Sequence, residues 1–220
     1  MKKYIAEFFG TMIFILMGCC AAVCSNFDVN FASGFGSAIA FGLAVVTMVY
    51  TIGGVSGCHI NPAITLGAWI TKRITRKDAI MYMIAQVLGT IVGLALLWLA
   101  IYNTVSLNTY QEVVSVIGIL IGEIIITYVF IPGTLAYRYV GQFYGLAIIA
   151  IGFGWVGFCF IGIGFIGFFV NRALSIGTAL FQDIADQLNF FTLGTFLGAV
   201  LATVVWEAIN DNCCEDNYEK

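Results

Sequence analysis

The stretch SGCHINPAITLG, residues 56–67, places a helix start inside an otherwise apolar sequence. Asn is a strong N-cap and Pro is pre-set for the first helical position, so Asn61-Pro62 predicts that a helix begins here. From Asn61 to about Trp69 there is room for about two turns, or roughly 13 Å, which is about half the hydrocarbon core of a bilayer. We therefore expect a half-helix over about residues 61–69.

The composition of the chain indicates where such a half-helix would lie. Of the 220 residues, 61% are hydrophobic and only 10% are charged, whereas about 25% of the residues of an ordinary soluble domain are charged. Six apolar runs have about the 20 residues that cross a bilayer: 4–23, 34–53, 79–101, 113–131, 142–162 and 188–209. The sequence therefore predicts an all-α membrane protein with six transmembrane helices.

The Lys and Arg residues predict the orientation, because cytoplasmic loops collect them. Eight of the nine fall on one side of the predicted membrane: Lys2, Lys3, Lys72, Arg73, Arg76, Lys77, Arg138 and Lys220. The opposite loops, 25–33, 103–113 and 181–187, carry acidic residues and no cation. We therefore expect a multi-pass protein of the cell membrane with both termini cytoplasmic and residues 211–220 as a cytoplasmic tail.

The two halves of the chain repeat a pattern. LGTIVG at 88–93 recurs as LGTFLG at 193–198, each a small-xxx-small face on which helices approach closely, and AEFFGT at 6–11 has an echo in GEIIIT at 122–127. Three spans per half give the halves opposite orientations, and inverted repeats place their functional site at the midplane, between broken helices. We expect one domain over 1–220, with repeats at 1–103 and 104–210 and a second half-helix at about 171–180.

These residues carry a family resemblance. The pattern SG-x-H-x-NPA-x-T at 56–65 resembles the first NPA box of the aquaporin family, or major intrinsic proteins, which comprises water channels and glycerol facilitators. AEF-x-GT at 6–11 and Y-x-x-AQ-x-x-G at 82–89 are similar to that family too. The resemblance implies six spans, two re-entrant half-helices and a homotetramer in which each protomer holds its own pore. It implies no cofactor and no metal.

In such a fold the two half-helices meet at their N-termini. Their partial positive charges repel cations, which is the accepted explanation of exclusion in aquaporin-type pores. Asn61 and Asn171 would offer amide donors to a passing solute, and the carbonyls of the segments before them would offer acceptors. The predicted pore centre is Asn61, Pro62, Ala63, Asn171, Arg172 and Ala173, and the predicted pore-lining backbone is Gly57, Cys58, His59 and Phe169.

The second box departs from the family pattern Asn-Pro-Ala-Arg. Here Arg172 replaces the proline and Leu174 replaces the filter arginine. Residues two positions apart in a helix lie about 200° apart around its axis. Arg172 would therefore project from the opposite side to position 174, and it is not a substitute for the lost arginine. The family's constriction positions fall at Phe41, Cys159, Phe168 and Leu174. We expect an apolar constriction that dewets and passes water slowly, or that prefers less polar neutral solutes.

Four polar residues inside the apolar regions have two interpretations each. Arg172 is expensive at the midplane and either strengthens the central cation barrier or anchors the structure, with Glu123, Glu7 or a loop carbonyl as its partner. Glu7 and Glu123 brace the re-entrant loops, as the resemblance implies, or transfer protons. His59 lines the pore or is a packed side chain.

The sequence favours a passive channel for water or small uncharged solutes, and leaves open a non-conducting, gated or ion-permeable member of the family. It does not favour an enzyme: GVSG at 54–57 resembles a rhomboid protease motif, but the only histidine, His59, lies on the same segment as Ser56. Nothing indicates nucleic-acid binding, because no basic patch with aromatic residues is present. Cys213 and Cys214 could carry lipid or bind metal.

Overall fold

The computed structural model describes residues 1–24, 31–100, 116–136, 144–165, 171–179 and 185–210. Regular structure in these ranges is α-helical throughout. The helices are α1 (Lys2–Cys24), α2 (Phe31–Ser56), α3 (Pro62–Ile70), α4 (Arg76–Ala100), α5 (Val116–Ala136), α6 (Tyr144–Phe165), α7 (Arg172–Ala179) and α8 (Ala185–Asn210).

The long helices coincide with the predicted spans, and α3 and α7 lie where half-helices were predicted. Among the residues whose side chains are described, four stretches are long and apolar enough to cross a membrane: Lys2–Ala22, Phe35–Ser56, Arg76–Ala100 and Thr192–Ile209. Gly145–Phe160 of α6 is a shorter apolar stretch. The prediction of an all-α membrane fold is therefore confirmed.

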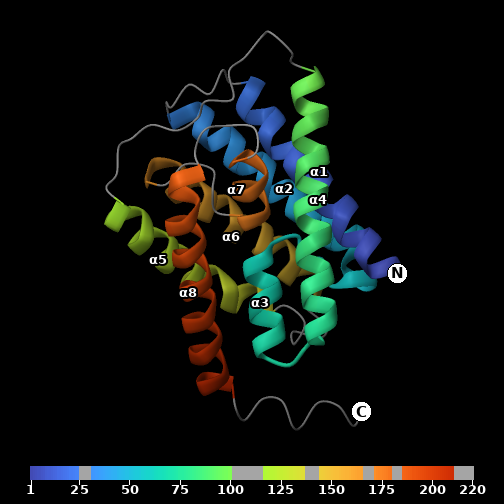
Figure 1. Cartoon of the computed structure of the whole chain (residues 1–220), viewed down its shortest axis with the longest axis vertical. Helices are drawn as coiled ribbons and strands as arrows, with labels where there is room; N and C mark the ends of the chain where they lie inside the picture. The colour runs from blue at the N-terminus through green and yellow to red at the C-terminus, as the bar shows by residue number, and fades with distance from the viewer. Residues whose placement is uncertain (25–30, 101–115, 137–143, 166–170, 180–184, 211–220) are drawn as a thin grey trace.

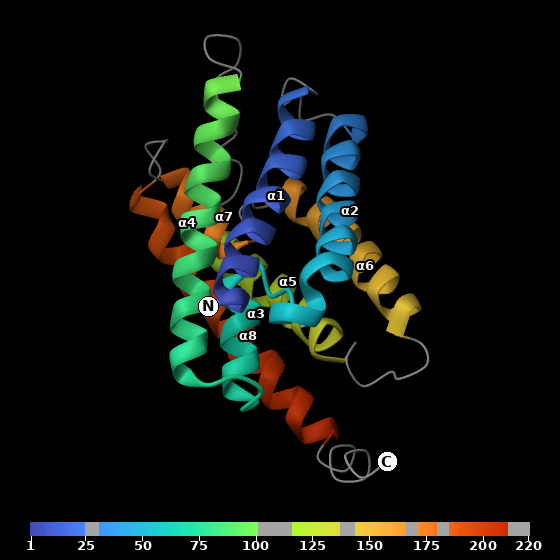
Figure 2. The same cartoon turned by 90° about the vertical axis from the view of Figure 1, so that its right-hand side faces the viewer.

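The long helices surround the two short ones (Figures 1 and 2). α1 packs against α2 and α4, α5 packs against α8 and α6, and α2 packs against α6. α3 contacts α4, α5 and α8, while α7 contacts α4 and α8, and the two short helices contact each other. In both views α7 lies above α3, and each short helix packs against more than one long helix.

The repeated small-residue faces are the places where neighbouring helices come closest. A Cβ at Gly89 of α4 would lie 2.3 Å from the carbonyl oxygen of Phe8 on α1. A Cβ at Gly198 of α8 would lie 2.6 Å from the carbonyl oxygen of Ile124 on α5. Only glycine permits these approaches, and α1 and α4 pair in the first half as α5 and α8 do in the second.

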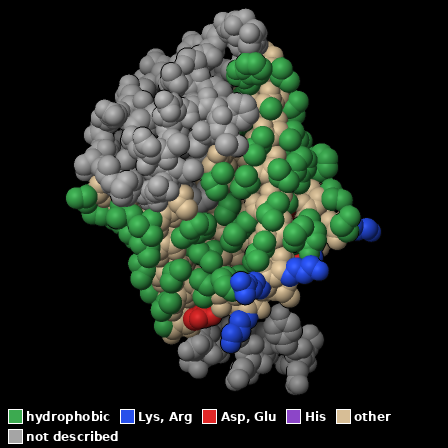
Figure 3. Space-filling model, in the orientation of Figure 1, with side chains coloured by type: hydrophobic (Ala, Val, Ile, Leu, Met, Phe, Trp, Pro, Cys, Tyr) green, Lys and Arg blue, Asp and Glu red, His purple; other side chains and the backbone are tan. Residues whose placement is uncertain are grey.

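The surface is apolar along the helices and charged toward one end. Figure 3 shows hydrophobic side chains over most of the described part of one face, with Lys and Arg side chains in its lower half. Exposed large hydrophobic residues are found on α1, α2, α4, α5, α6 and α8. A surface of this kind matches a lipid environment, with charged residues at the edge of the membrane.

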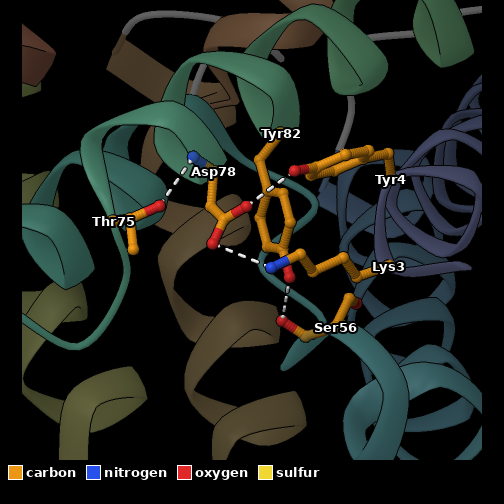
Figure 4. A network of polar contacts seen from close by, with 6 residues as sticks. All are labelled: Lys3, Tyr4, Ser56, Thr75, Asp78 and Tyr82. Atoms are coloured by element: carbon orange, nitrogen blue, oxygen red, sulfur yellow. Dashed lines mark hydrogen bonds and ion pairs between the residues drawn. The ribbon is translucent and has the colours of Figure 1, made fainter. Parts of the chain in front are cut away.

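A polar network at the charged end joins the starts of α1 and α4 (Figure 4). Lys3 Nζ lies 2.8 Å from a carboxylate oxygen of Asp78, and the Tyr4 hydroxyl donates to the other oxygen at 2.7 Å. Thr75 Oγ1 accepts a hydrogen bond from the Asp78 N–H at 3.1 Å, in the first turn of α4. The network fixes the first turn of α1 next to that of α4.

Candidate functional site

The first half-helix begins at a capped asparagine, as the sequence predicted. Asn61 has an extended backbone, and its Oδ1 accepts a hydrogen bond from the Ala63 N–H at 2.9 Å. Pro62 fills the first helical position, where no N–H donor is needed. The helix ends near Thr71, whose N–H donates to the Gly67 carbonyl at 3.0 Å. The local sequence therefore sets both ends of α3.

The second half-helix begins in the same way, and the two starts meet. Asn171 Oδ1 accepts from the Ala173 N–H at 3.0 Å, and Asn171 Nδ2 donates to the carbonyl oxygen of Ile60 at 2.7 Å. Asn61 and Asn171 are both buried. Each start carries a partial positive charge of about half a unit, so the field where they meet disfavours cations.

The segment before Asn61 has a strained backbone. Gly57, Cys58 and Ile60 have φ values of 92°, 51° and 44°. Ile60 is the most unusual, because a β-branched residue rarely adopts the left-handed region. Glycine adopts such values readily, whereas non-glycine residues there cost about 1–3 kcal/mol each and persist only where neighbouring groups hold them.

Glu7 of α1 holds this segment. Its Oε1 accepts hydrogen bonds from Ser56 Oγ at 2.6 Å and from the His59 N–H at 2.9 Å. Its Oε2 accepts from the Ile60 N–H at 2.7 Å and from Gln86 Nε2 at 2.8 Å. The Glu7 side chain is fully buried. It accepts hydrogen bonds from the N–H groups of His59 and Ile60, which lie between α2 and α3, outside both helices.

Two residues of α4, absent from the predicted site, complete the support. Gln86 Nε2 also donates to Thr65 Oγ1 at 3.0 Å, and the Tyr82 hydroxyl donates to the Ser56 carbonyl at 2.8 Å (Figure 4). Their signal in the sequence is a pair of polar side chains four positions apart on an otherwise apolar helix. That spacing places both on the face toward the re-entrant segment.

His59 contacts both the support and the interior. Its Nδ1 lies 3.2 Å from Thr65 Oγ1, with the donor set by the tautomer, and its ring lies edge-on to Tyr82 with centroids 5.1 Å apart. It also lines the cavity described below. His59 is therefore packed against the support and also lines the cavity, and its place in the pore wall stays a prediction.

Glu123 of α5 is the counterpart of Glu7 in the second half. It is fully buried and accepts a hydrogen bond from Thr195 Oγ1 of α8 at 2.5 Å. The segment that it was predicted to brace, with Phe168 and Phe169, lies outside the described residues, as does the Arg172 side chain. The backbone places Arg172 at the first position of α7.

A cavity of about 40 Å³ lies beside the first re-entrant segment. One water needs about 10–15 Å³, so the cavity has room for a few waters. Its walls are the segment itself, apolar residues of α2 and α6, one residue of α5, and α3 with the residues after it: Val45, Val49, Gly57, Cys58, His59, Ile60, Asn61, Ile64, Ala68, Arg73, Ile74, Thr134, Ile151 and Trp155. The cavity thus runs from the cap of α3 to Arg73 beyond its C-terminus.

Three of the four predicted constriction residues are described. Phe41, Cys159 and Leu174 are buried and belong to one hydrophobic core, although they come from α2, α6 and α7. The Phe41 ring packs against Phe14 of α1, with centroids 5.0 Å apart. Their common surroundings are apolar, in agreement with the character of their side chains.

Irregular backbone at membrane depth is tolerated only where protein buries it or where it lines a cavity. A bundle of long apolar helices around two half-helices, with a strained segment along a cavity, therefore defines a transmembrane channel. The chain belongs to the major intrinsic protein family, whose sequence pattern matches residues 1–206. Members of this family are passive channels for water and small solutes, and are not enzymes.

Individual relatives agree with this membership. The chain is 37% identical to a protein named aquaporin Z from Brucella melitensis over 95% of this chain and 98% of that protein. It is 33% identical to another aquaporin Z, from Rhodopseudomonas palustris, over 95% and 93%. The X-ray structure of the aquaglyceroporin from Plasmodium falciparum has the same fold, with a TM-score of 0.77 at 20% identity over 96% of each chain.

Proposed function

We propose that the protein is a passive channel for water and other small uncharged solutes, with an apolar outer constriction. The observation that carries the proposal is the meeting of two asparagine-capped half-helices beside a cavity lined by Gly57, Cys58 and His59. The names of the two aquaporin Z relatives favour water as the solute. Water is therefore the first solute to test.

The pore centre would bind each passing solute through fixed donors and acceptors. An Asn amide carries two N–H donors, and one donor of Asn171 is directed at Ile60. The helix starts would repel cations and protons at the same place. We propose Asn61, Pro62, Ala63, Asn171, Arg172 and Ala173 as this centre, with the backbone of 57–59 and Phe169 as its lining.

The outer constriction would limit the rate of flux. A ring of Phe41, Cys159, Phe168 and Leu174 has a thiol as its only weakly polar group. Water that enters such a ring loses hydrogen-bond partners, so the ring dewets readily. We therefore expect water permeability that is measurable but slow.

Stopped-flow light scattering on proteoliposomes tests the proposal, with gradients of water, glycerol, urea and ammonia in turn. We expect water flux above that of protein-free liposomes and no flux of sodium or protons. Equal water flux in both vesicle types would show a non-conducting protein, and sodium flux would show an ion-permeable one. Either result would refute the proposed function.

The thiol of Cys159 allows a check on the constriction. We expect a mercurial to reduce water flux and Cys159→Ser to resist the reagent. Cys58 is a second candidate target because it lines the cavity, so Cys58→Ser is the matched control. Block that persists in Cys159→Ser and disappears in Cys58→Ser would remove Cys159 from the pore wall.

Arg172 has two proposed roles, as part of the central cation barrier or as an anchor away from the pore. Arg172→Pro restores the residue that the family has at this position. Under the first role the variant lets protons or sodium through reconstituted vesicles, whereas under the second it stays as tight as wild type. A pH-sensitive dye inside the vesicles measures the difference.

The assembly and topology are also proposals. We propose a homotetramer in the cell membrane with both termini cytoplasmic and inverted repeats at 1–103 and 104–210. The loops of one side hold the cations, and the described Lys72, Arg76 and Lys77 are exposed. Native mass spectrometry measures the assembly, and labelling of single cysteines placed at Lys77 and at Asp28 from either side of sealed vesicles measures the topology.

A further inference from the structure

Trp155 of α6 lies where the cavity meets the hydrophobic core. It is 2% exposed and lines the cavity together with Asn61 and Ile60, the residues at the meeting point of the half-helices. A tryptophan is the largest side chain a pore wall can carry. Because Trp155 and Asn61 line the same cavity of about 40 Å³, a large ring forms part of the wall of the space that begins at the capped start of α3.

Neighbouring aromatic rings fix the orientation of the indole. Trp155 packs edge-on against Phe14 of α1, with centroids 5.5 Å apart, and in a tilted arrangement, with an interplanar angle of 35°, against Phe158, with centroids 5.3 Å apart. Phe14 in turn packs against Phe41 at 5.0 Å. Because ring pairs of this kind hold their geometry, the indole cannot swing aside without repacking α1 and α2.

The spacing along α6 orders three residues across the bundle. Ile151, Trp155 and Cys159 follow one another at intervals of four residues, about one turn each, so they lie on the same face of the helix. All three belong to the hydrophobic core that also contains Phe41 and Leu174. Ile151 and Trp155 also line the cavity, and Cys159 is not among the residues that line it. Trp155 is therefore the cavity-lining residue of this face nearest in sequence to Cys159 of the proposed outer constriction.

We propose that Trp155 forms a second constriction at the pore centre, and that its bulk sets the rate and the size limit of permeation. The inference rests on the proposed function, because only a conducting channel has a rate to limit. An apolar ring in the wall of the cavity that Asn61 also lines narrows the path and removes water neighbours from a passing solute. In this proposal the outer constriction limits the entry of solutes into the pore, and Trp155 limits their passage through its centre.

Three variants test this constriction: Trp155→Val, Trp155→Phe and the control Phe158→Val. Phe158 is buried and contacts Trp155 but does not line the cavity, so its truncation costs core packing without widening the path. We expect Trp155→Val to raise water permeability about tenfold, which corresponds to a barrier lower by about 1.4 kcal/mol. Trp155→Phe should rise less, and Phe158→Val should stay near wild type.

Glycerol supplies a readout that a purely structural role would not change. We expect Trp155→Val to raise glycerol permeability relative to water, while sodium stays excluded. The inference is overturned if Trp155→Val and Trp155→Phe both keep the wild-type rates for both solutes, or if Phe158→Val produces the same rise. Should Trp155→Val leak sodium through a damaged bundle, Trp155→Phe alone decides between these outcomes.

The outcomes separate this inference from the proposed function. If wild type conducts water and the Trp155 variants do not differ from it, the second constriction is wrong and the channel function stands. If wild type does not conduct and Trp155→Val does, the proposed function is wrong and Trp155 closes the pore. If none conducts, both are wrong.

Discussion

Glu7→Gln isolates the support of the strained segment, because each carboxylate oxygen of Glu7 serves one backbone donor and one side chain. Oε1 accepts from His59 N–H and Ser56 Oγ, and Oε2 accepts from Ile60 N–H and Gln86 Nε2. Glutamine has one acceptor oxygen and one NH₂ group. Whichever way the amide is turned, one backbone N–H then faces a donor and cannot turn away.

The expected cost follows from these bonds. A buried donor left unsatisfied costs ~1–3 kcal/mol and a lost side-chain hydrogen bond ~0.5–1.5 kcal/mol. A value of about 3 kcal/mol lowers the Tm of a chain of this size by about 6–12 °C. The strained carbonyls of residues 57–60 would also lose their alignment along the cavity, so we expect lower water flux.

Thermal unfolding in detergent and stopped-flow water flux measure the two effects of Glu7→Gln. The matched control is Glu207→Gln, at an exposed position of α8, which should leave both unchanged. Wild-type Tm and flux in Glu7→Gln would refute the bracing argument. If wild type conducts protons and Glu7→Gln does not, at unchanged Tm, the result would instead assign Glu7 to proton transfer.

Two glycines give further predictions. Gly89→Ala brings a Cβ within 2.3 Å of the Phe8 carbonyl oxygen. We expect the free energy of unfolding to fall by about 1–3 kcal/mol, as in overpacked cores, which a lower Tm would show. The control Gly54→Ala, whose Cβ would meet nothing within 4 Å, should match wild type. Gly18→Ala places a Cβ 2.0 Å from the Phe41 ring. We expect the ring to move toward the pore and to lower water flux. Wild-type flux at wild-type Tm would contradict a role of Phe41 in the constriction.

The elements that the sequence predicted best are those with local causes. The span lengths follow from runs of apolar residues, and the starts of α3 and α7 follow from Asn61 and Asn171, whose caps use neighbours two residues away. The small-residue faces were also readable, because Gly89 and Gly198 recur at matched places. None of these features needs knowledge of which helices meet.

The features that the sequence did not predict depend on contacts between distant segments. Gln86 approaches Glu7 across 79 positions of the chain, and its role follows only once α1 and α4 are paired. Positive φ at Ile60 contradicts the preference of a β-branched residue. Trp155 is one of many aromatic residues in apolar runs, and only packing distinguishes a wall residue from a core residue.

The bond between Asn171 and the Ile60 carbonyl has a consequence for the order of assembly during synthesis. The described hydrogen-bond partners of the Glu7 carboxylate all lie within the first 86 positions, so we expect the first re-entrant segment to take its strained shape while the ribosome is still making the second half. The hydrogen bond to the Ile60 carbonyl oxygen forms only after Asn171, 111 positions later, has been synthesised. We therefore expect a chain that stops before Asn171 to hold the braced loop with the Ile60 carbonyl still lacking this donor, which the second half then supplies.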